Sequence, residues 1–251
     1  MKLRLFLLIT AGLYFSFFSF AGEGIEVAEE LLVDLDAADD TAGDDVWINN
    51  GTLDDFARVG NPQKVEIRGV PAVQFSGGIP DAYQCLENAP ETLIGPDPTR
   101  SIEVWVYNED IAAEETMVAW GKRGGPCGTN MSFNYGTNVH FGAVGHWCWD
   151  FQDLGWDPVP IAGQWHYLVY TYDGTTTRVY ADGVLNNEEV LGPGKINTHG
   201  GTPITLAAQY EADGFTLNVP LAGTLALARV RVHAGVLTPV SYTHLTLPTK
   251  A

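Results

Sequence analysis

The chain has 251 residues, of which 45% are hydrophobic, 11% aromatic and 18% charged, as in a folded globular protein. Its 31 acidic and 13 basic residues give a formal net charge of −18. This negative field excludes nucleic acids and anionic membrane surfaces as natural partners, and it leaves cations, neutral sugars and basic proteins.

Residues 1–21 are typical of a signal peptide. Lys2 and Arg4 precede an apolar or small run up to Phe20, and Ser19-Phe20-Ala21 fits a cleavage site. The run is nearly long enough for a retained membrane anchor, but acidic rather than basic residues follow it. We therefore expect cleavage, no membrane insertion of the mature chain, and a secreted, cell-surface or periplasmic location in which disulfides form.

Strand signals are short in the first part of the mature chain. The segment from Glu26 to Asp36 predicts a helical turn leading into a first strand. Short alternating strands are predicted at 65–67 and 72–75. The segment from Pro80 to Arg100 holds four prolines and is predicted to be a loop, because proline interrupts a sheet.

The second part of the chain carries dense strand signals. Ile102, Val104 and Val106 share one face of a strand, and Asp173-Gly174 and Asp182-Gly183 predict the turns of a β-meander. Other strands are predicted at 116–120, 131–135, 139–143, 165–172, 177–181, 203–209 and 224–233. There is no long helical periodicity, no repeat and no second core. Residues 22–239 therefore predict one all-β domain, a two-sheet sandwich or jelly roll.

The segment 240–251 has an unusual sequence. From Val240 to Thr249 it matches the translation of a sequencing-library adapter. We expect that it is not biological and that the natural protein has additional domains C-terminal of this fragment. The alternative is a genuine terminal strand.

Three cysteines allow at most one internal disulfide. A hairpin is predicted from Met131 to Ala143, and a turn at Thr137-Asn138 places Cys127 opposite Cys148. A turn one residue earlier makes the two cysteines diagonal neighbours, which still keeps their sulfurs close. We predict a Cys127–Cys148 disulfide with Cys85 free; the alternative is three unpaired core cysteines.

Four sequence motifs, taken in their order and spacing, indicate a family. The most specific is the pattern W-H…Y-D-G…Y-x-D-G between Trp165 and Gly183. The other three are Phe75-Ser76-Gly77-Gly78 followed by Asp81, the strand Ser101–Val106, and the closing segment Ala222–Thr238. Over roughly residues 70 to 239, the chain resembles the laminin-G-like jelly-roll family of the concanavalin A-like lectin/glucanase superfamily. This resemblance implies a two-sheet antiparallel jelly roll that binds a glycan or glycoprotein, and it indicates a bacterial source.

Catalysis is also weighed, because the superfamily includes glucanases. Related glucanases carry their paired carboxylates on one strand face in an E-x-D-x-E pattern. No such triplet occurs here: Trp105 and Tyr107 follow Glu103 on its own face, and Glu114-Glu115 would point opposite ways on a strand. We therefore expect no catalytic residues.

The resemblance also implies calcium at one rim of the sandwich. Asp81 matches the first ligand position, and Gln209, Glu211 and Asp213 match a second group that follows a late strand. A weaker set consists of Asp150, Asp153 and Asp157. The alternative interpretation of both sets is solvated loop acids.

An irregular, aromatic segment is the predicted ligand contact. Trp147, Trp149 and Trp156 lie there with Asp150 and Asp153. Exposed rings can stack on sugars while carboxylates bind the hydroxyl groups, and aromatic residues on loops favour a binding role. The alternative is that these rings close one end of the sandwich as part of the core.

A basic turn, Lys122-Arg123, stands out in this acidic chain. It could hold an anionic sugar, or it is simply solvated. We expect a noncatalytic module that binds carbohydrate or glycoprotein, with calcium as a candidate cofactor. The alternatives are a structural or adhesion jelly roll with a protein ligand, and a divergent glycoside hydrolase.

Overall fold

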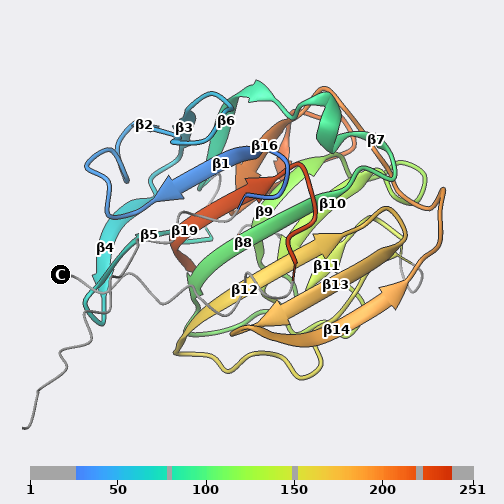
Figure 1. The fold of residues 1–251 in the computed structure, drawn as a ribbon. Helices are drawn as coiled ribbons and strands as arrows, with labels where there is room; N and C mark the ends of the chain where they lie inside the picture. Colours follow the sequence, from blue (N-terminus) through green and yellow to red (C-terminus); the bar gives the residue numbers. More distant parts are fainter. Residues whose placement is uncertain (1–26, 78–80, 149–151, 219–222, 239–251) are drawn as a thin grey trace, which may run out of the picture.

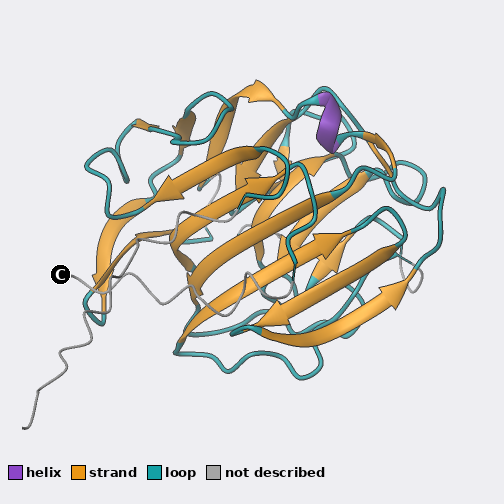
Figure 2. Ribbon diagram, in the orientation of Figure 1, coloured by secondary structure: helices purple, strands orange, loops and turns teal. Residues whose placement is uncertain are grey.

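The computed structural model describes residues 27–77, 81–148, 152–218 and 223–238. Within these ranges the chain forms strands and one turn of 3-10 helix, η1 (Glu91–Leu93), and no α-helix (Figures 1 and 2). Nineteen strands make two large antiparallel sheets and two small ones. In Figure 1 the first large sheet lies in front of the second, so the molecule is a two-layer sandwich. The prediction of an all-β jelly roll is confirmed.

The first sheet has eight strands in the order β14-β13-β12-β8-β19-β5-β4, with β1 also paired to β19. Their bounds are β14 (Val184–Val190), β13 (Thr176–Ala181), β12 (Trp165–Tyr172), β8 (Arg100–Tyr107), β19 (Ala226–His233), β5 (Val70–Gln74), β4 (Gln63–Ile67) and β1 (Leu31–Asp36). The predicted meander is the run β12-β13-β14, whose two connections are the Asp-Gly turns.

The second sheet has seven strands in the order β11-β10-β9-β16-β6-β3-β2. Their bounds are β11 (Val144–Gly145), β10 (Asn130–Asn134), β9 (Thr116–Gly121), β16 (Pro203–Leu206), β6 (Ala82–Asn88), β3 (Phe56–Val59) and β2 (Val46–Trp47). Two small pairs lie beside it: β7 (Gly95–Pro96) with β15 (Asn197–Thr198), and β17 (Gln209–Tyr210) with β18 (Leu217–Asn218).

The core forms between the two sheets because strand side chains alternate in direction. Val104 on β8 lies beside Leu168 and Val230 of the neighbouring strands, and all three are fully buried. Across the sandwich, Phe133 of β10 contacts Tyr170 of β12, with ring centroids 6.0 Å apart. The face predicted for the valines of β8 is therefore the core face.

The outer face of the first sheet carries a buried ionic cluster. The Glu103 carboxylate accepts hydrogen bonds from the Tyr167 hydroxyl and from His233 Nε2, the latter at 2.8 Å. Arg231 lies 3.9 Å from Glu103 and donates through Nε to Asp34 at 3.1 Å. The cluster joins β1, β19, β8 and β12, and it gives Glu103 a structural role.

Two sequence predictions about strands are wrong. The segment predicted as a loop from Pro80 to Arg100 contains β6, an inner strand of the second sheet, because its prolines flank the strand rather than interrupt it. The hairpin partner of β10 is β11, not residues 139–143, because Ser132 pairs with Gly145. The connection is longer than predicted, and residues 139–143 form part of it.

The predicted disulfide is confirmed: Cys127 and Cys148 are bonded, with Cα atoms 4.7 Å apart. Cys85 is free, as predicted, and it is buried. In the described ranges, no helix has the length and hydropathy that a membrane span needs. Residues 1–21 and 240–251 lie outside these ranges, so the signal peptide and the adapter stay predictions.

Candidate ligand-binding site

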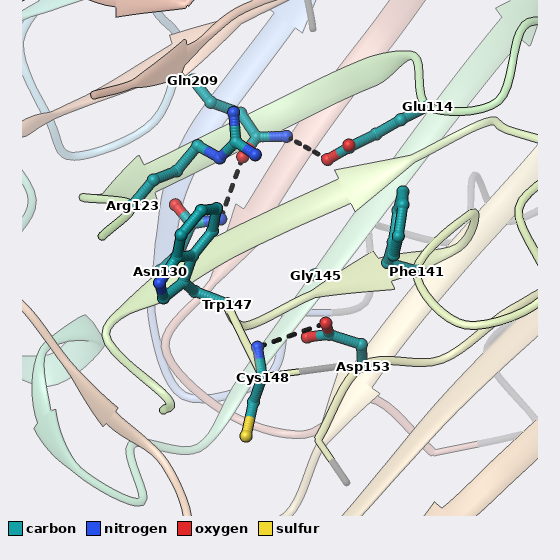
Figure 3. A pocket seen from close by; sticks show the side chains of 9 residues that line it. All are labelled: Glu114, Arg123, Asn130, Phe141, Gly145, Trp147, Cys148, Asp153 and Gln209. Atoms are coloured by element: carbon teal, nitrogen blue, oxygen red, sulfur yellow. Dashed lines mark hydrogen bonds between the residues drawn. The ribbon is translucent and has the colours of Figure 1, made fainter. Parts of the chain in front are cut away.

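A hollow of about 140 Å³ opens on the outer face of the second sheet, beside β10 and β11. Since Met131 and Phe133 of β10 point into the core, Asn130 and Ser132 point to this outer face. Figure 3 shows the residues that line the hollow: Glu114, Arg123, Asn130, Phe141, Gly145, Trp147, Cys148, Asp153 and Gln209. They come from four separate parts of the chain.

Gly145 of β11 lines the hollow and adds no side chain to it. A Cβ atom at this position would lie only 2.6 Å from the Ser132 hydroxyl oxygen, so a side chain here would require the Ser132 side chain to move. Glycine at position 145 thus leaves room for the Ser132 hydroxyl beside β11.

Trp147 is the exposed aromatic residue of the site. Its backbone has φ of +59°, its side chain is 39% exposed, and the Arg123 guanidinium lies 4.6 Å from its ring centroid. Both neighbours are fixed: Cys148 by the disulfide and His146 by full burial. The backbone N–H groups of His146 and Cys148 donate to the Asp153 carboxylate. This turn presents the indole ring at the surface.

His146 anchors the turn from the interior of the sandwich. Burial lowers the pKa of His146 to about 3, and the Arg100 charge adds to the effect, so the ring is neutral. Arg100 approaches His146 Nε2 at 3.2 Å, and His146 Nδ1 lies 2.7 Å from the Gln152 carbonyl oxygen. A neutral ring satisfies both contacts when Nε2 accepts and Nδ1 donates.

Polar side chains of the hollow form a chain of hydrogen bonds, drawn in Figure 3. The Gln209 amide donates to Glu114 Oε1 at 2.8 Å, and its carbonyl accepts from Asn130 Nδ2 at 2.9 Å. Asn130 is 2% exposed, and its Oδ1 atom has no hydrogen-bond partner in the described structure. Buried polar atoms are almost always paired, so this acceptor indicates a place for a donor from a ligand or a bound water.

The Glu114 carboxyl group lies in an environment of low polarity. Burial raises its pKa, and the nearby Asp153 charge also raises it, whereas the Gln209 hydrogen bond and the Arg123 charge act in the opposite direction. The net direction is upward. The hollow thus combines an aromatic ring, a cation, an amide acceptor and a partly desolvated carboxyl group.

The predicted ligand contacts fare differently in the structure. Trp147 and Asp153 line the hollow. The prediction for Trp156 is wrong: the residue is 5% exposed, packs against Phe133 and donates its indole N–H to the Asn134 carbonyl at 3.1 Å. It faces the core because the segment before it pairs back onto β11 at Leu154. Trp149 and Asp150 lie outside the described residues.

Seven of the nine lining residues were not among the predicted ligand contacts: Glu114, Arg123, Asn130, Phe141, Gly145, Cys148 and Gln209. Gln209 was expected to bind metal, and Arg123 belongs to the basic turn. The alternation of β10 is a signal that could have placed Asn130 on the outer face.

The predicted calcium ligands do not fit a single site in this structure. Both Asp81 oxygens accept protein hydrogen bonds, from Asn61 N–H and from the backbone N–H and hydroxyl of Ser76. Glu211 accepts from Asn218, and Asp213 accepts from Thr216 within the β17–β18 connection. Across the described ranges, no three His, Cys, Asp or Glu side chains are grouped as metal ligands would be. Calcium binding stays a prediction of the sequence.

Comparisons with known proteins agree on the fold. A family model described as "Concanavalin A-like lectin/glucanases superfamily", the laminin-G type, matches residues 80–240. A search of curated proteins finds no significant match. Among solved structures, domain 4 of AbnA, an extracellular arabinanase from Geobacillus stearothermophilus in complex with arabinotriose, aligns with a TM-score of 0.51 at 18% identity. That alignment covers 87% of this chain and 98% of the domain.

Two further structures are parts of larger proteins. Trypanosoma rangeli sialidase aligns with a TM-score of 0.55 at 12% identity, over 87% of this chain and 32% of the sialidase. The receptor-binding domain of botulinum neurotoxin D aligns with a TM-score of 0.53 at 12% identity, over 85% of this chain and 51% of that domain. The chain therefore spans about a third and a half of these two structures. At such identities the likeness shows the fold.

Proposed function

Because this chain belongs to the laminin-G-like family of the concanavalin A-like lectin/glucanase superfamily, we propose that it is a noncatalytic module that binds glycans through the Trp147 hollow. The observation that carries the proposal is the partly exposed indole ring of Trp147 at the edge of a polar hollow. A sugar ring has an apolar face and a rim of hydroxyl groups, so it needs both an aromatic surface and placed polar groups.

The polar groups of the hollow suit this ligand. Asn130 Oδ1 can accept from a sugar hydroxyl, and Arg123 can donate to one. The disulfide and the buried His146 fix the turn before a ligand arrives, so less conformational entropy is lost on binding. The arabinotriose complex of AbnA domain 4, which shares this fold, supports a glycan as the ligand class.

The noncatalytic part of the proposal depends on Asp153. A glycosidase needs two carboxyl groups free to act on either side of the bond that breaks. Glu114 and Asp153 both line the hollow, but the two oxygens of Asp153 accept backbone N–H groups of the Trp147 turn. We therefore assign Asp153 to positioning the turn, and Glu114 to ligand contact.

A glycoside hydrolase is the second candidate, favoured by the raised pKa of Glu114 beside a second carboxylate. The test is release of reducing ends from each bound oligosaccharide by the wild type and by Glu114→Gln. No release by either protein supports the binding module. Release that Glu114→Gln abolishes while binding persists would establish the enzyme.

We also propose that the protein acts outside the cytoplasm. The Cys127–Cys148 disulfide supports this location, because disulfides persist in oxidising compartments. A glycoprotein ligand and a purely structural role with a protein partner remain alternatives to a free glycan. Loss of binding when the glycans of a captured glycoprotein are removed enzymatically supports the glycan, and retained binding supports a protein ligand.

The direct test of the binding proposal is a panel of linear trisaccharides, among them arabinotriose, xylotriose, cellotriose, maltotriose and chitotriose, together with a glycan array. We expect the wild type to bind at least one probe, and Trp147→Ala to weaken that binding by about tenfold or more, the loss of roughly 1.4 kcal/mol. The control is Trp165→Ala, which removes a partly buried indole from the other sheet. Isothermal titration gives the affinities, and thermal unfolding confirms that both variants fold.

The proposal is wrong if no probe binds the wild type. It is also wrong if Trp147→Ala binds as tightly as the wild type.

A further inference from the structure

A second hollow lies at the disulfide, next to the Trp147 hollow. It measures about 580 Å³ and is lined by Cys127, Cys148, Gln152, Glu189, Val190, Leu191 and Lys195. Cys148 lines both hollows, so the two are neighbours across one residue. The described residues of the second hollow come from the disulfide, from Gln152, and from the end of β14 with the segment after it.

The sizes of the two hollows differ in a way that matters for the ligand. Sites for small molecules usually enclose about 300 to 1,000 Å³. The Trp147 hollow, at about 140 Å³, is smaller than this range, so it can hold only part of such a ligand. The second hollow, at about 580 Å³, lies within the range and can hold the rest.

Gln152 gives the second hollow a buried acceptor. The side chain is 5% exposed, and its amide nitrogen donates to the Lys195 carbonyl. Its Oε1 atom has no hydrogen-bond partner in the described part of the chain. The Gln152 backbone carbonyl also accepts from the buried His146 ring, which helps to hold the residue in place. A fixed, unpaired acceptor suits a hydroxyl donor of a ligand.

Part of the lining of the second hollow is apolar and exposed. Val190 ends β14, an edge strand, and its side chain is 71% exposed. Glu189 and Lys195 supply charged groups of opposite sign at the margin. An apolar surface with a few polar groups is the composition of a small-molecule subsite.

We propose that the two hollows are subsites of one extended site that crosses the Cys127–Cys148 disulfide. The inference rests on the proposed glycan-binding function and names the ligand class more closely: an oligosaccharide of two or more residues. One ring stacks on Trp147. A neighbouring sugar unit of the same oligosaccharide lies in the second hollow, and one of its hydroxyl groups donates a hydrogen bond to Gln152 Oε1.

The test measures binding of oligosaccharides of one to five sugar units, which have the same sugar and linkage as a trisaccharide that binds. Val190→Arg fills the second hollow with a long side chain, and Val184→Arg is the matched control, because Val184 is 68% exposed at the other end of β14. For the wild type, we expect affinity to rise about tenfold or more from one residue to three. We expect Val190→Arg to remove this rise and to leave monosaccharide binding within about twofold, and Val184→Arg to match the wild type.

Two failures are distinguishable in this experiment. The extended site is overturned if the affinity of the wild type does not rise with oligosaccharide length, or if Val190→Arg leaves that rise unchanged. Either result counts against it even when Trp147→Ala weakens binding. No binding of any probe by the wild type overturns the glycan function, and the extended site with it.

Discussion

Trp147 adopts a backbone conformation that is costly for a residue with a side chain. A positive φ outside glycine costs on the order of 1 kcal/mol, and it persists only where surrounding contacts determine it. Here those contacts are the buried His146 ring, the Asp153 carboxylate and the disulfide at Cys148. The most strained aromatic residue of the site is therefore also its most exposed one.

His166 and Asp182 form an ion pair in the β12-β13-β14 meander, at the W-H and second D-G positions of its sequence motif. The ring Nδ1 lies 2.8 Å from Asp182 Oδ2, and Nε2 lies 2.9 Å from the Ile161 carbonyl. Burial by itself lowers the pKa of His166, but these hydrogen bonds outweigh it, so the pKa is raised above 6.5. Burial by itself raises the pKa of the Asp182 carboxyl, but the His166 contact and the hydrogen bond from the Tyr167 N–H outweigh it, so this pKa is held below 3.8.

This pair predicts a pH-dependent stability. The contribution of His166 is fully present below about pH 6.5 and is lost as the pH rises through its raised folded pKa. The contribution of Asp182 is present above about pH 3.8 and is lost as the pH falls through its lowered pKa. We expect Asp182→Asn to destabilise the protein most between about pH 4 and 6.5, and progressively less above that range. Urea unfolding from pH 4 to 9 measures this.

Asp173→Asn is the matched control, at the other Asp-Gly turn. Burial opposes ionisation of Asp173, but hydrogen bonds from Arg178 and Thr175 lower its pKa to about 2, so its contribution is constant above about pH 5. A pH-independent difference for Asp182→Asn between pH 5 and 9 would contradict the assignment to His166.

At the scale of elements, the sequence predicted the strands whose side chains alternate cleanly. The valines of β8 identified a core face, and the two Asp-Gly turns identified the β12-β13-β14 meander. β6 was missed because the loop prediction counted the four prolines between Pro80 and Arg100 without regard to their positions. All four lie outside Ala82–Asn88. The second half of the β10 hairpin was misplaced because a turn-like Gly136-Thr137-Asn138 lies inside a longer connection.

The candidate site could be predicted only in part, because its residues converge in space and not in sequence. Trp147 and Asp153 share one aromatic segment, which composition identifies. Gln209 and Glu114 lie 95 positions apart and meet through a hydrogen bond. No local pattern shows that contact, and Trp156 resembles Trp147 in sequence context although one is buried and the other exposed.

The disulfide connects the end of the β9–β10 connection to the Trp147 turn, across a sequence separation of 21 residues. Closing a loop of this length restricts the unfolded chain and stabilises the fold by about 3 kcal/mol. We expect the double variant Cys127→Ser/Cys148→Ser to lose about that much unfolding free energy in urea, and to bind glycan more weakly because the Trp147 turn loses an anchor.

Cys85→Ser is the control for this variant, since it leaves the disulfide intact. Burial raises the pKa of the Cys85 thiol to about 11, so the native protein should not react with thiol reagents at neutral pH. Equal stability of the double variant and the wild type would show that the disulfide contributes little to the fold.

At the scale of the whole molecule, a net charge of −18 opposes the compact state. We expect the melting temperature to rise when NaCl is added from about 10 to 150 mM, because salt at this concentration screens charges about 8 Å apart or more. Thermal unfolding in CaCl2, MgCl2 and NaCl of matched ionic strength separates screening from specific binding.

The same experiment tests the calcium prediction. A calcium site predicts an additional rise in CaCl2 alone, which Asp213→Ala removes, because a ligand of the native state stabilises it by mass action. Equal melting temperatures in the three salts would remove Asp81, Gln209, Glu211 and Asp213 as calcium ligands.

The antiparallel pairing of β1 with β19 brings the first and last strands of the domain together. Leu31 lies opposite His233, and the pairing continues outward as Ala234 N–H donates to the Glu30 carbonyl and Gly235 N–H to the Ala28 carbonyl. Paired residues in such a ladder are about 5 Å apart. The polypeptide thus enters and leaves the domain at neighbouring positions. A domain with this geometry can be inserted into a surface loop of a host protein without separating the two ends of that loop.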